Sequence, residues 1–200
     1  MNRAFTVWLT GITGSGKSTI GAALGDALRS RGLPVEVLDS GRIRRQINRS
    51  MGFTREEIET NLLRLSYECT LLNRNGVVAI VTAVSPYREA RARVRKATGD
   101  FVEVYCRCPL EIVKQRGSME LFTKAERGEV THVAGVNAPY EEPLNPEVLL
   151  DTDRLSVEES VAKTLERLEE LGRIDRVESA QYTQDEEAMI RQRLRDLGYL

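Results

Sequence analysis

The stretch Gly11-Ile12-Thr13-Gly14-Ser15-Gly16-Lys17-Ser18 has the spacing G-x-x-x-x-G-K-[ST]. Its glycines allow successive backbone N–H groups to turn inward around phosphate oxygens. The ammonium of Lys17 would reach the β- and γ-phosphates, and the hydroxyl of Ser18 could bind Mg²⁺. A strand is predicted before this stretch and a helix after it, so that the positive end of the helix points at the anion. The stretch therefore predicts a phosphate-binding loop on an α/β fold.

The rest of the chain alternates between predicted strands and helices. Strands are expected at residues 5–10, 35–38, 77–83, 102–105 and 148–150. Helices are expected at residues 17–31, 54–74, 87–97 and 156–171. The segment 77–83 is almost entirely apolar, which is typical of a strand buried on both faces in a parallel sheet. This alternation predicts the three-layer sandwich of a P-loop NTPase, with a parallel sheet of about five strands and helices on both faces.

Two segments fall outside the alternation. Residues 116–146 are charged and contain several Gly and Pro, and long segments of this kind in compact domains are usually functional lids or disordered. After Gly172 the sequence becomes polar, and a last helix is predicted at about 184–197. We expect a P-loop kinase domain over residues 1–172 with a lid at about 116–146, followed by a C-terminal helical extension at 173–200.

The composition excludes several classes of protein. The 200 residues carry 29 Lys or Arg and 30 Asp or Glu, a formal net charge of −1, which argues against a nucleic-acid-binding protein. The longest apolar run, residues 76–84, is well under the ~20 residues that span a bilayer, and no signal-peptide pattern opens the chain. We expect a cytoplasmic protein that does not associate with membranes. Three cysteines and one histidine make a disulfide framework or a zinc site improbable.

GTPases, ATPase motors and small-molecule kinases all share the phosphate-binding loop. This chain has no Asn-Lys-x-Asp motif for reading guanine, and it is short for a motor core. Its strand at 77–83 ends without the acidic residue that usually helps to hold Mg²⁺, whereas Asp39 directly follows the strand at 35–38. A small-molecule kinase that uses ATP and Mg²⁺ is therefore favoured, with Ser18 and Asp39 at the metal site. The loop residues expected to bind ATP are Gly11, Thr13, Gly14, Ser15, Gly16, Lys17, Ser18 and Thr19.

Further motifs follow the loop in a fixed order. They are Val-Leu-Asp39 with Arg44 five residues on, Gly52-Phe53-Thr54, Asn61, Arg74-Asn75-Gly76, Ser85-Pro86-Tyr87-Arg88, Gly-Asp-Phe-Val-Glu-Val-Tyr at 99–105, Pro109-Leu110-Glu111, and Pro139-Tyr140-Glu141 with Pro143-Leu144-Asn145-Pro146. With these motifs, residues 5–171 resemble the adenylyl-sulfate kinases (APS kinases) of sulfate assimilation. That family transfers a phosphoryl group from ATP to the 3′-hydroxyl of adenosine 5′-phosphosulfate (APS), giving 3′-phosphoadenosine 5′-phosphosulfate.

The resemblance implies roles for individual residues around the acceptor. Asp39 would help to hold Mg²⁺ through water and could accept the proton of the hydroxyl. Arg44 and Asn61 would hold the phosphosulfate region, and Phe53 would stack on the base. Ser85 would lie on a loop that faces the acceptor, which makes it the third candidate catalytic residue beside Lys17 and Asp39.

The resemblance also implies contacts from the lid. Arg116, Lys124 and Arg127 would lie in or near the part that closes over the phosphates, with Arg116 on the nucleotide and Lys124 on the substrate. Val133 occupies the place of a second aromatic residue that clamps the base in the family. Because family members often pair as dimers, the resemblance also allows a homodimer.

Four departures from the family fall on the acceptor side, while the loop is intact. They are Gly41 in place of the second Asp of Asp-Gly-Asp, Ile58 in place of an Arg, Met119 within a lid motif that usually reads Arg-Asp-x-Lys-Gly, and Val133 in place of the aromatic residue. Stacking on a base is worth ~1–3 kcal/mol, and a charged hydrogen bond ~1.5–3 kcal/mol. Together these losses could weaken binding of the usual acceptor by roughly two to four decades.

Three functions stay open on this reading. The first is phosphorylation of APS, in which case Gly41→Asp is expected to raise activity by restoring a carboxylate. The second is a related kinase with a different nucleotide-linked or small alcohol acceptor. The third is a non-catalytic ATP-binding partner protein.

Two simpler interpretations concern the segment after the strand at 77–83. Ser85 is expected to cap the helix that begins near Pro86, since serine is a favoured N-cap with proline next to it. The arginines of that helix are expected to form a solvated face: Arg88, Arg91, Arg93 and Arg95.

Overall fold

The structure, a computed structural model, describes residues 4–47, 52–176, 189, 191–193 and 195, and only the backbone of residues 117–121. Its described part contains a parallel sheet of five strands in the order β2-β3-β1-β4-β5. The strands are β1 (Thr6–Thr10), β2 (Val35–Asp39), β3 (Val78–Thr82), β4 (Phe101–Arg107) and β5 (Val148–Asp151). The predicted parallel sheet is confirmed.

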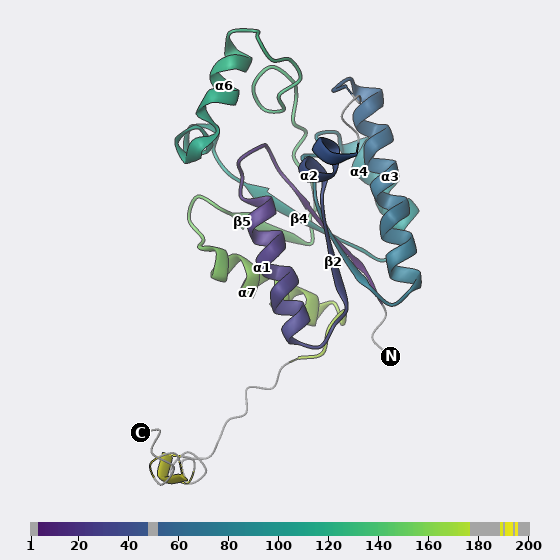
Figure 1. The fold of residues 1–200 in the computed structure, drawn as a ribbon, viewed down its shortest axis with the longest axis vertical. Coiled ribbons are helices and arrows are strands. Elements are labelled where there is room, and N and C mark those ends of the chain that lie inside the picture. The colour runs from purple at the N-terminus through teal and green to yellow at the C-terminus, as the bar shows by residue number, and fades with distance from the viewer. Residues whose placement is uncertain (1–3, 48–51, 177–188, 190, 194, 196–200) are drawn as a thin grey trace.

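Helices cover both faces of this sheet. They are α1 (Lys17–Ser30), α2 (Ser40–Gln46), α3 (Arg55–Arg74), α4 (Arg88–Thr98), α5 (Leu110–Val113), the π-helical turn η1 (Lys114–Ser118), α6 (Met119–Glu126) and α7 (Val157–Glu170). Helices α1 and α7 lie on one face, and α3 and α4 lie on the other (Figure 1). The three layers predicted from the sequence are therefore present. Within the described residues, no helix combines the length and the apolar composition needed to cross a membrane.

Strand β1 shows why the sheet is apolar on both faces. All five of its residues are buried. Val7 and Leu9 pack into the core beneath α1 and α7, whereas Trp8 packs into the core beneath α3 and α4. Because side chains alternate between the faces of a strand, a central strand covered by helices must be apolar in both directions.

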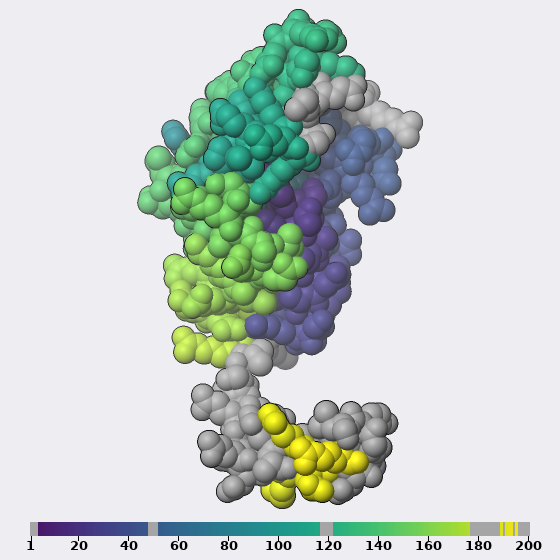
Figure 2. All heavy atoms as spheres, turned by 90° about the vertical axis from the view of Figure 1, so that its left-hand side faces the viewer, coloured from purple at the N-terminus to yellow at the C-terminus, as the bar shows by residue number. Residues whose placement is uncertain are grey.

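The segment 116–146 is more ordered than the sequence predicted. It contains most of η1 and all of α6, and its residues Phe122, Ala125 and Val133 form a small core with Cys108 and Val113. Figure 2 shows this segment in teal and green above α1 and α7. The expectation of a long segment outside the regular elements was wrong for this part of the chain, because two of the five core residues, Cys108 and Val113, come from outside it and give its apolar side chains a surface to pack against.

Helix α2 was also missed by the sequence analysis. It begins directly after β2, and the carboxylate of Asp39 caps it by accepting a hydrogen bond of 2.7 Å from the backbone N–H of Arg42. Capping by Asp stabilises a helix by about 1 kcal/mol. Helix α7 begins with a capping box, in which the Ser156 hydroxyl accepts from the Glu159 N–H and the Glu159 carboxylate accepts from the Ser156 N–H.

The C-terminal predictions are only partly covered. The helix expected at about 184–197 falls largely outside the described residues. Ile174 packs into the core beneath α1 and α7, and Arg173 forms an ion pair of 2.6 Å with Asp100. Packed chain therefore continues past residue 172, and the division into a kinase domain and an extension stays a prediction.

The expectation of a solvated arginine face on α4 was wrong for Arg91. This side chain is only 4% exposed, and its Nε donates to the Glu103 carboxylate at 2.8 Å. Its other nitrogens donate to the carbonyl oxygens of Ser85 at 2.6 Å and Glu141 at 2.7 Å. The partners come from the β3–α4 loop, β4 and the C-terminal part of the segment 116–146, so helical spacing alone could not distinguish Arg91 from its exposed neighbours.

We expect Arg91→Met to lower the free energy of unfolding by about 3–5 kcal/mol, because it removes the closer cationic partner of the Glu103 carboxylate and leaves only Arg95, at 3.6 Å, beside it. In a chain of this size the melting temperature should fall by roughly 10 °C. Arg93→Met is the matched control, since Arg93 is half-exposed on the same helix and its ion pairs with Glu59 and Glu89 should contribute under about 1 kcal/mol. Equal losses for the two variants in thermal unfolding would contradict a special role for the buried pair.

Candidate active site

The phosphate-binding loop connects β1 to α1 and depends on its glycines. Gly14 and Gly16 have φ angles of 82° and 90°, in the left-handed region that glycine adopts without strain. At position 11 steric hindrance excludes residues other than glycine, because a Cβ atom there would lie 2.4 Å from the carbonyl oxygen of Cys106. The loop therefore takes its shape from the absence of side chains, and α1 begins directly behind it.

Lys17 is the first residue of α1 and is only 8% exposed. Its ammonium donates to the carbonyl oxygen of Ile12 at 2.7 Å, across the loop. Burial lowers the pKa of Lys17 to about 8, and the nearby Asp39 carboxylate opposes this shift only in part. The loop thus holds a cation that an anionic ligand would stabilise further.

We expect nucleotide binding near pH 8 to take up protons. At that pH about half of the Lys17 side chains are neutral, and the phosphates of a nucleotide would favour the ammonium form. Affinity for ATP should therefore fall as the pH rises from 7 to 9. Calorimetric titrations at pH 8 in two buffers of different ionisation enthalpy measure the uptake. Lys17→Arg, which stays charged, should lose it, and an unchanged uptake in that variant would contradict the assignment to Lys17.

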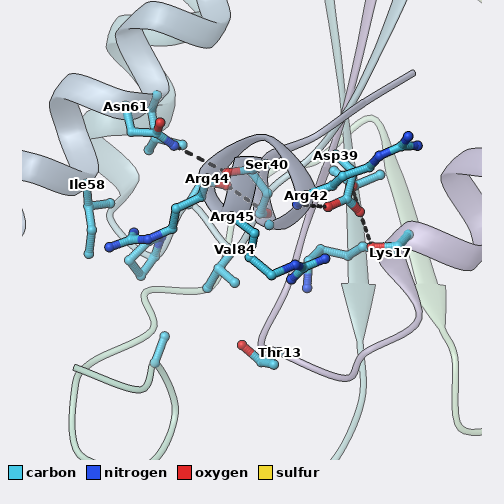
Figure 3. Close-up of a pocket in the computed structure, with 18 of the residues that line it drawn as sticks. Thr13, Lys17, Asp39, Ser40, Arg42, Arg44, Arg45, Ile58, Asn61 and Val84 are labelled. Atoms are coloured by element: carbon cyan, nitrogen blue, oxygen red, sulfur yellow. Dashed lines mark hydrogen bonds between the residues drawn. The ribbon is translucent and has the colours of Figure 1, made fainter. Parts of the chain in front are cut away.

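Asp39 ends β2 and lies opposite Thr82 in the register of the sheet. Its carboxylate accepts hydrogen bonds from the hydroxyls of Ser18 at 2.5 Å and Thr82 at 3.0 Å, in addition to the Arg42 N–H (Figure 3). Burial alone would raise the pKa of Asp39, but these hydrogen bonds outweigh it and hold the pKa below its usual value. An ionised carboxylate therefore lies beside the loop at neutral pH.

The loop opens onto a cavity of about 1150 Å³. Ten of the residues that the sequence analysis singled out for the site line it: Thr13, Gly14, Lys17, Ser18, Asp39, Arg44, Phe53, Asn61, Ser85 and Val133. They come from the loop, α2, α3, the β3–α4 loop and the lid. The fold thus brings the predicted phosphate-donor and acceptor residues to one cavity.

The predicted acceptor residues lie on one side of Asp39. The guanidinium of Arg44 lies over the ring of Phe53, 3.5 Å from its centroid, and donates to the carbonyl oxygen of Gly52. The Asn61 amide donates to the Ser40 hydroxyl at 3.3 Å. Phe53 is 49% exposed, so one face of its ring is available to a ligand. These contacts form an aromatic and cationic wall about the cavity.

Ser85 lies in the wall of the cavity, but its hydroxyl is hydrogen-bonded to other residues of the protein. The residue is 2% exposed, and its hydroxyl accepts from the Trp8 indole N–H at 3.1 Å and donates to the Thr10 hydroxyl at 2.9 Å. Its backbone has a positive φ of 39°. The predicted N-cap role was wrong, because α4 begins at Arg88 and Tyr87 holds the cap position. These bonds favour a role in shaping the loop over direct contact with a substrate.

Comparison with known proteins identifies the family of this site. The family profile described as Adenylylsulphate kinase matches residues 3–151. This chain belongs to that family. The adenylyl-sulfate kinase of Gloeothece citriformis is 45% identical over 170 residues, which cover 85% of this chain and 97% of that protein.

Solved structures of adenylyl-sulfate kinases have the same fold. One is the APS kinase of Mycobacterium tuberculosis in complex with AMPPNP and APS, which is 38% identical with a TM-score of 0.79 over 84% of this chain and 99% of that one. Another is the hexameric APS kinase of Thiobacillus denitrificans, 30% identical with a TM-score of 0.65 over 86% of this chain and 30% of that one. The resemblance stated from the motifs is therefore confirmed.

Three of the four departures from the adenylyl-sulfate kinase pattern lie on the cavity wall. Gly41, Ile58 and Val133 all line it. Val133 is 7% exposed and packs in the small core of the lid, so that it presents little surface to a ligand. The side chain of Met119 lies outside the described part. The acceptor side of the cavity is thus more apolar than the family pattern implies.

The predicted lid cations are not on the cavity wall. Arg116 donates to the carbonyl oxygen of Thr152 at 2.7 Å and reaches the sulfur of Cys108 at 3.9 Å. Lys124 is exposed on α6, and Arg127 is exposed just after it. Their predicted roles on nucleotide and substrate stay predictions, and they would require the lid to approach the loop.

The sequence analysis missed two groups at the site. Thr82 escaped notice because its importance comes from its register opposite Asp39, which no local pattern shows. Arg42 and Arg45 line the cavity from α2. The run Arg42-Ile43-Arg44-Arg45 directly after the Asp39 turn could have signalled an anion-binding turn, but the family motif drew attention to Arg44 alone.

Proposed function

We propose that this chain transfers the γ-phosphoryl group of ATP to the 3′-hydroxyl of APS in a Mg²⁺-dependent reaction. Membership of the adenylyl-sulfate kinase family supports the reaction class. The observation that carries the proposal is the cluster of Lys17, Ser18 and Asp39 at the mouth of a cavity that Arg44 and Phe53 also line. Donor phosphates and an acceptor nucleotide could meet there.

The residues present suit a magnesium ion. Mg²⁺ prefers oxygen ligands and usually binds through one or two carboxylates together with substrate phosphates and water. The Ser18 hydroxyl and the ionised Asp39 carboxylate are in direct contact at the end of the loop. When bound, the ion would neutralise charge on the β- and γ-phosphates.

The groups of the protein bind the donor phosphates, orient the acceptor and accept its proton. The loop amides and the Lys17 ammonium would hold the β- and γ-phosphates, while Arg44, Phe53 and Asn61 would orient the acceptor. The bond from the γ-phosphorus to the β–γ bridging oxygen breaks as the bond to the acceptor oxygen forms. The proton of the acceptor hydroxyl passes to the Asp39 carboxylate. Catalysis of phosphoryl transfer depends mainly on such positioning and charge stabilisation.

A second candidate is the same reaction with another nucleotide-linked or small alcohol acceptor. Two observations favour it: Ile58 lines the cavity wall where the family pattern has a cation, and Val133, largely buried in the lid core, leaves the wall without the aromatic ring of the family. A smaller or less anionic acceptor would lose less binding free energy at those positions than APS does.

A coupled assay of ADP release with ATP, Mg²⁺ and APS tests the proposal. Other nucleotides and small alcohols form a panel beside APS. Turnover that rises with APS supports the proposal. Turnover with another acceptor alone favours the second candidate. Saturable ATP binding without turnover across the panel would contradict both and favour a non-catalytic ATP-binding protein.

We also propose that the protein acts in the cytoplasm as a homodimer, as the family resemblance implies. Sedimentation velocity at micromolar concentration tests the dimer. A single species of 22.5 kDa at every concentration would contradict it.

A further inference from the structure

Two arginines of α2 point into different parts of the cavity. Figure 3 shows Arg44 extended toward Ile58, whereas Arg45 extends toward Lys17 and the phosphate-binding loop. Both line the cavity. Arg44 lies over Phe53, on the acceptor side. Arg45 therefore brings a second guanidinium to the side where the donor phosphates would lie.

Gly41 lies beside both Asp39 and Arg45. A Cβ atom on residue 41 would lie 3.3 Å from Asp39 Oδ1 and 3.5 Å from Arg45 Nη1. One point thus lies within 3.5 Å of both the carboxylate and the guanidinium. A carboxylate introduced at residue 41 would therefore be within reach of the Arg45 guanidinium.

The two charged groups also interact electrostatically. The guanidinium of Arg45 is one of the groups that lower the pKa of Asp39, after the hydrogen bonds from Ser18, Arg42 and Thr82. Because Asp39 contacts Ser18 of the loop, Arg45 lies close to the place where the γ-phosphoryl group would leave ATP.

We infer that Arg45 is a catalytic residue that contacts the transferring phosphoryl group. The inference rests on the proposed function for the identity of the reaction. A guanidinium stays protonated and offers several N–H donors to phosphate oxygens. Arg45 would therefore stabilise the equatorial oxygens of the phosphoryl group during transfer without exchanging a proton.

The first test compares Arg45→Gln and Arg45→Lys with the wild type in the ADP-release assay. Removing a charged hydrogen bond that forms only in the transition state should lower kcat and kcat/KM together, by about 10- to 100-fold. The KM for ATP should stay within about threefold. Arg45→Lys should recover part of the loss because it keeps the charge. Arg167→Gln on α7 is the control for loss of a surface arginine. Unchanged kcat in Arg45→Gln would overturn the inference.

A binding measurement separates this inference from the identity of the acceptor. ADP with aluminium fluoride mimics the phosphoryl group in transfer, whereas AMPPNP mimics the ground state. With Mg²⁺ present and no acceptor, Arg45→Gln should weaken the aluminium fluoride complex at least tenfold relative to the AMPPNP complex. Equal weakening of both would overturn the inference. If the wild type does not turn over APS, the proposed function fails and this pair of affinities alone decides the role of Arg45.

Gly41→Asp provides a second variant, for which this inference predicts the opposite of the outcome expected from the sequence. An added carboxylate would lie beside Arg45 and pair with it, so kcat should fall rather than rise. Gly41→Ala is the matched control, with a small expected change. In the Arg45→Gln background, Gly41→Asp should have a much smaller effect, which a double-mutant cycle measures. A rise in kcat in Gly41→Asp, or equal effects in both backgrounds, would overturn the inference.

Discussion

Replacing Lys17 by alanine is expected to lower kcat/KM by about 10³-fold or more, as cations on the transferring phosphates are among the largest contributors to phosphoryl transfer. The ammonium donates across the loop to the Ile12 carbonyl oxygen, and the residue is buried at the place where the β- and γ-phosphates would bind. Its partial desolvation makes it a stronger partner for an anion than an exposed lysine would be. The loss should appear both in AMPPNP affinity and in kcat.

Lys163→Ala, an exposed position on α7, is the matched control for this variant. Circular dichroism and thermal unfolding should show that Lys17→Ala still folds, and burial of a smaller neutral group should leave stability unchanged or higher. Full activity in a folded Lys17→Ala variant would contradict the assignment of the phosphate-binding loop.

Asp39→Asn is expected to lower kcat by about 10²- to 10⁴-fold, the range of a general base. Asparagine keeps the shape of the side chain and can still accept the hydrogen bond that caps α2 at the Arg42 N–H. It removes the negative charge that contacts Ser18, and with it both a proton acceptor and a ligand for Mg²⁺. Because hydrogen bonds hold the pKa of Asp39 below its usual value, the wild-type rate should not fall through this group until the pH drops below about 4.

The Mg²⁺ dependence of the rate separates the two roles of Asp39. If it mainly helps to hold the ion, excess Mg²⁺ should restore much of the activity of Asp39→Asn. If it acts as the base, the loss should persist at saturating Mg²⁺. Asp175→Asn is an exposed control. A variant at Asp39 with wild-type kcat at every Mg²⁺ concentration would contradict both roles.

Two of the four departures that were estimated to weaken acceptor binding lie at different places in the structure. Val133 packs in the lid core, and Gly41 lies beside Asp39 and Arg45, so these two positions change the cavity in different ways. The first removes a surface for the base of the acceptor. The second puts a glycine beside the Arg45 guanidinium, where the family pattern has a carboxylate. Activity toward APS therefore depends on whether Arg45 compensates at the reacting phosphate for what is lost around the acceptor.

The phosphate-binding loop, the parallel sheet and the family could be predicted from the sequence because each depends on local order along the chain. Glycine spacing sets the loop, apolar runs mark strands buried on both faces, and motifs in a fixed order carry the resemblance. Asp39 and Lys17 could be singled out in the same way, because Asp39 stands at the end of a predicted strand and Lys17 at the start of a predicted helix.

Only the tertiary structure decided how side chains on separate elements meet. Arg91 and its neighbours on α4 look alike in sequence, and burial of Arg91 depends on Glu103 from β4 and on Glu141 from the segment 116–146. Thr82 matters because the sheet places it opposite Asp39. Only the fold directs Arg45 toward Lys17 while Arg44 points toward Ile58 (Figure 3). A sequence records which groups are present, whereas charge stabilisation acts over a few ångströms and is fixed only when the chain packs.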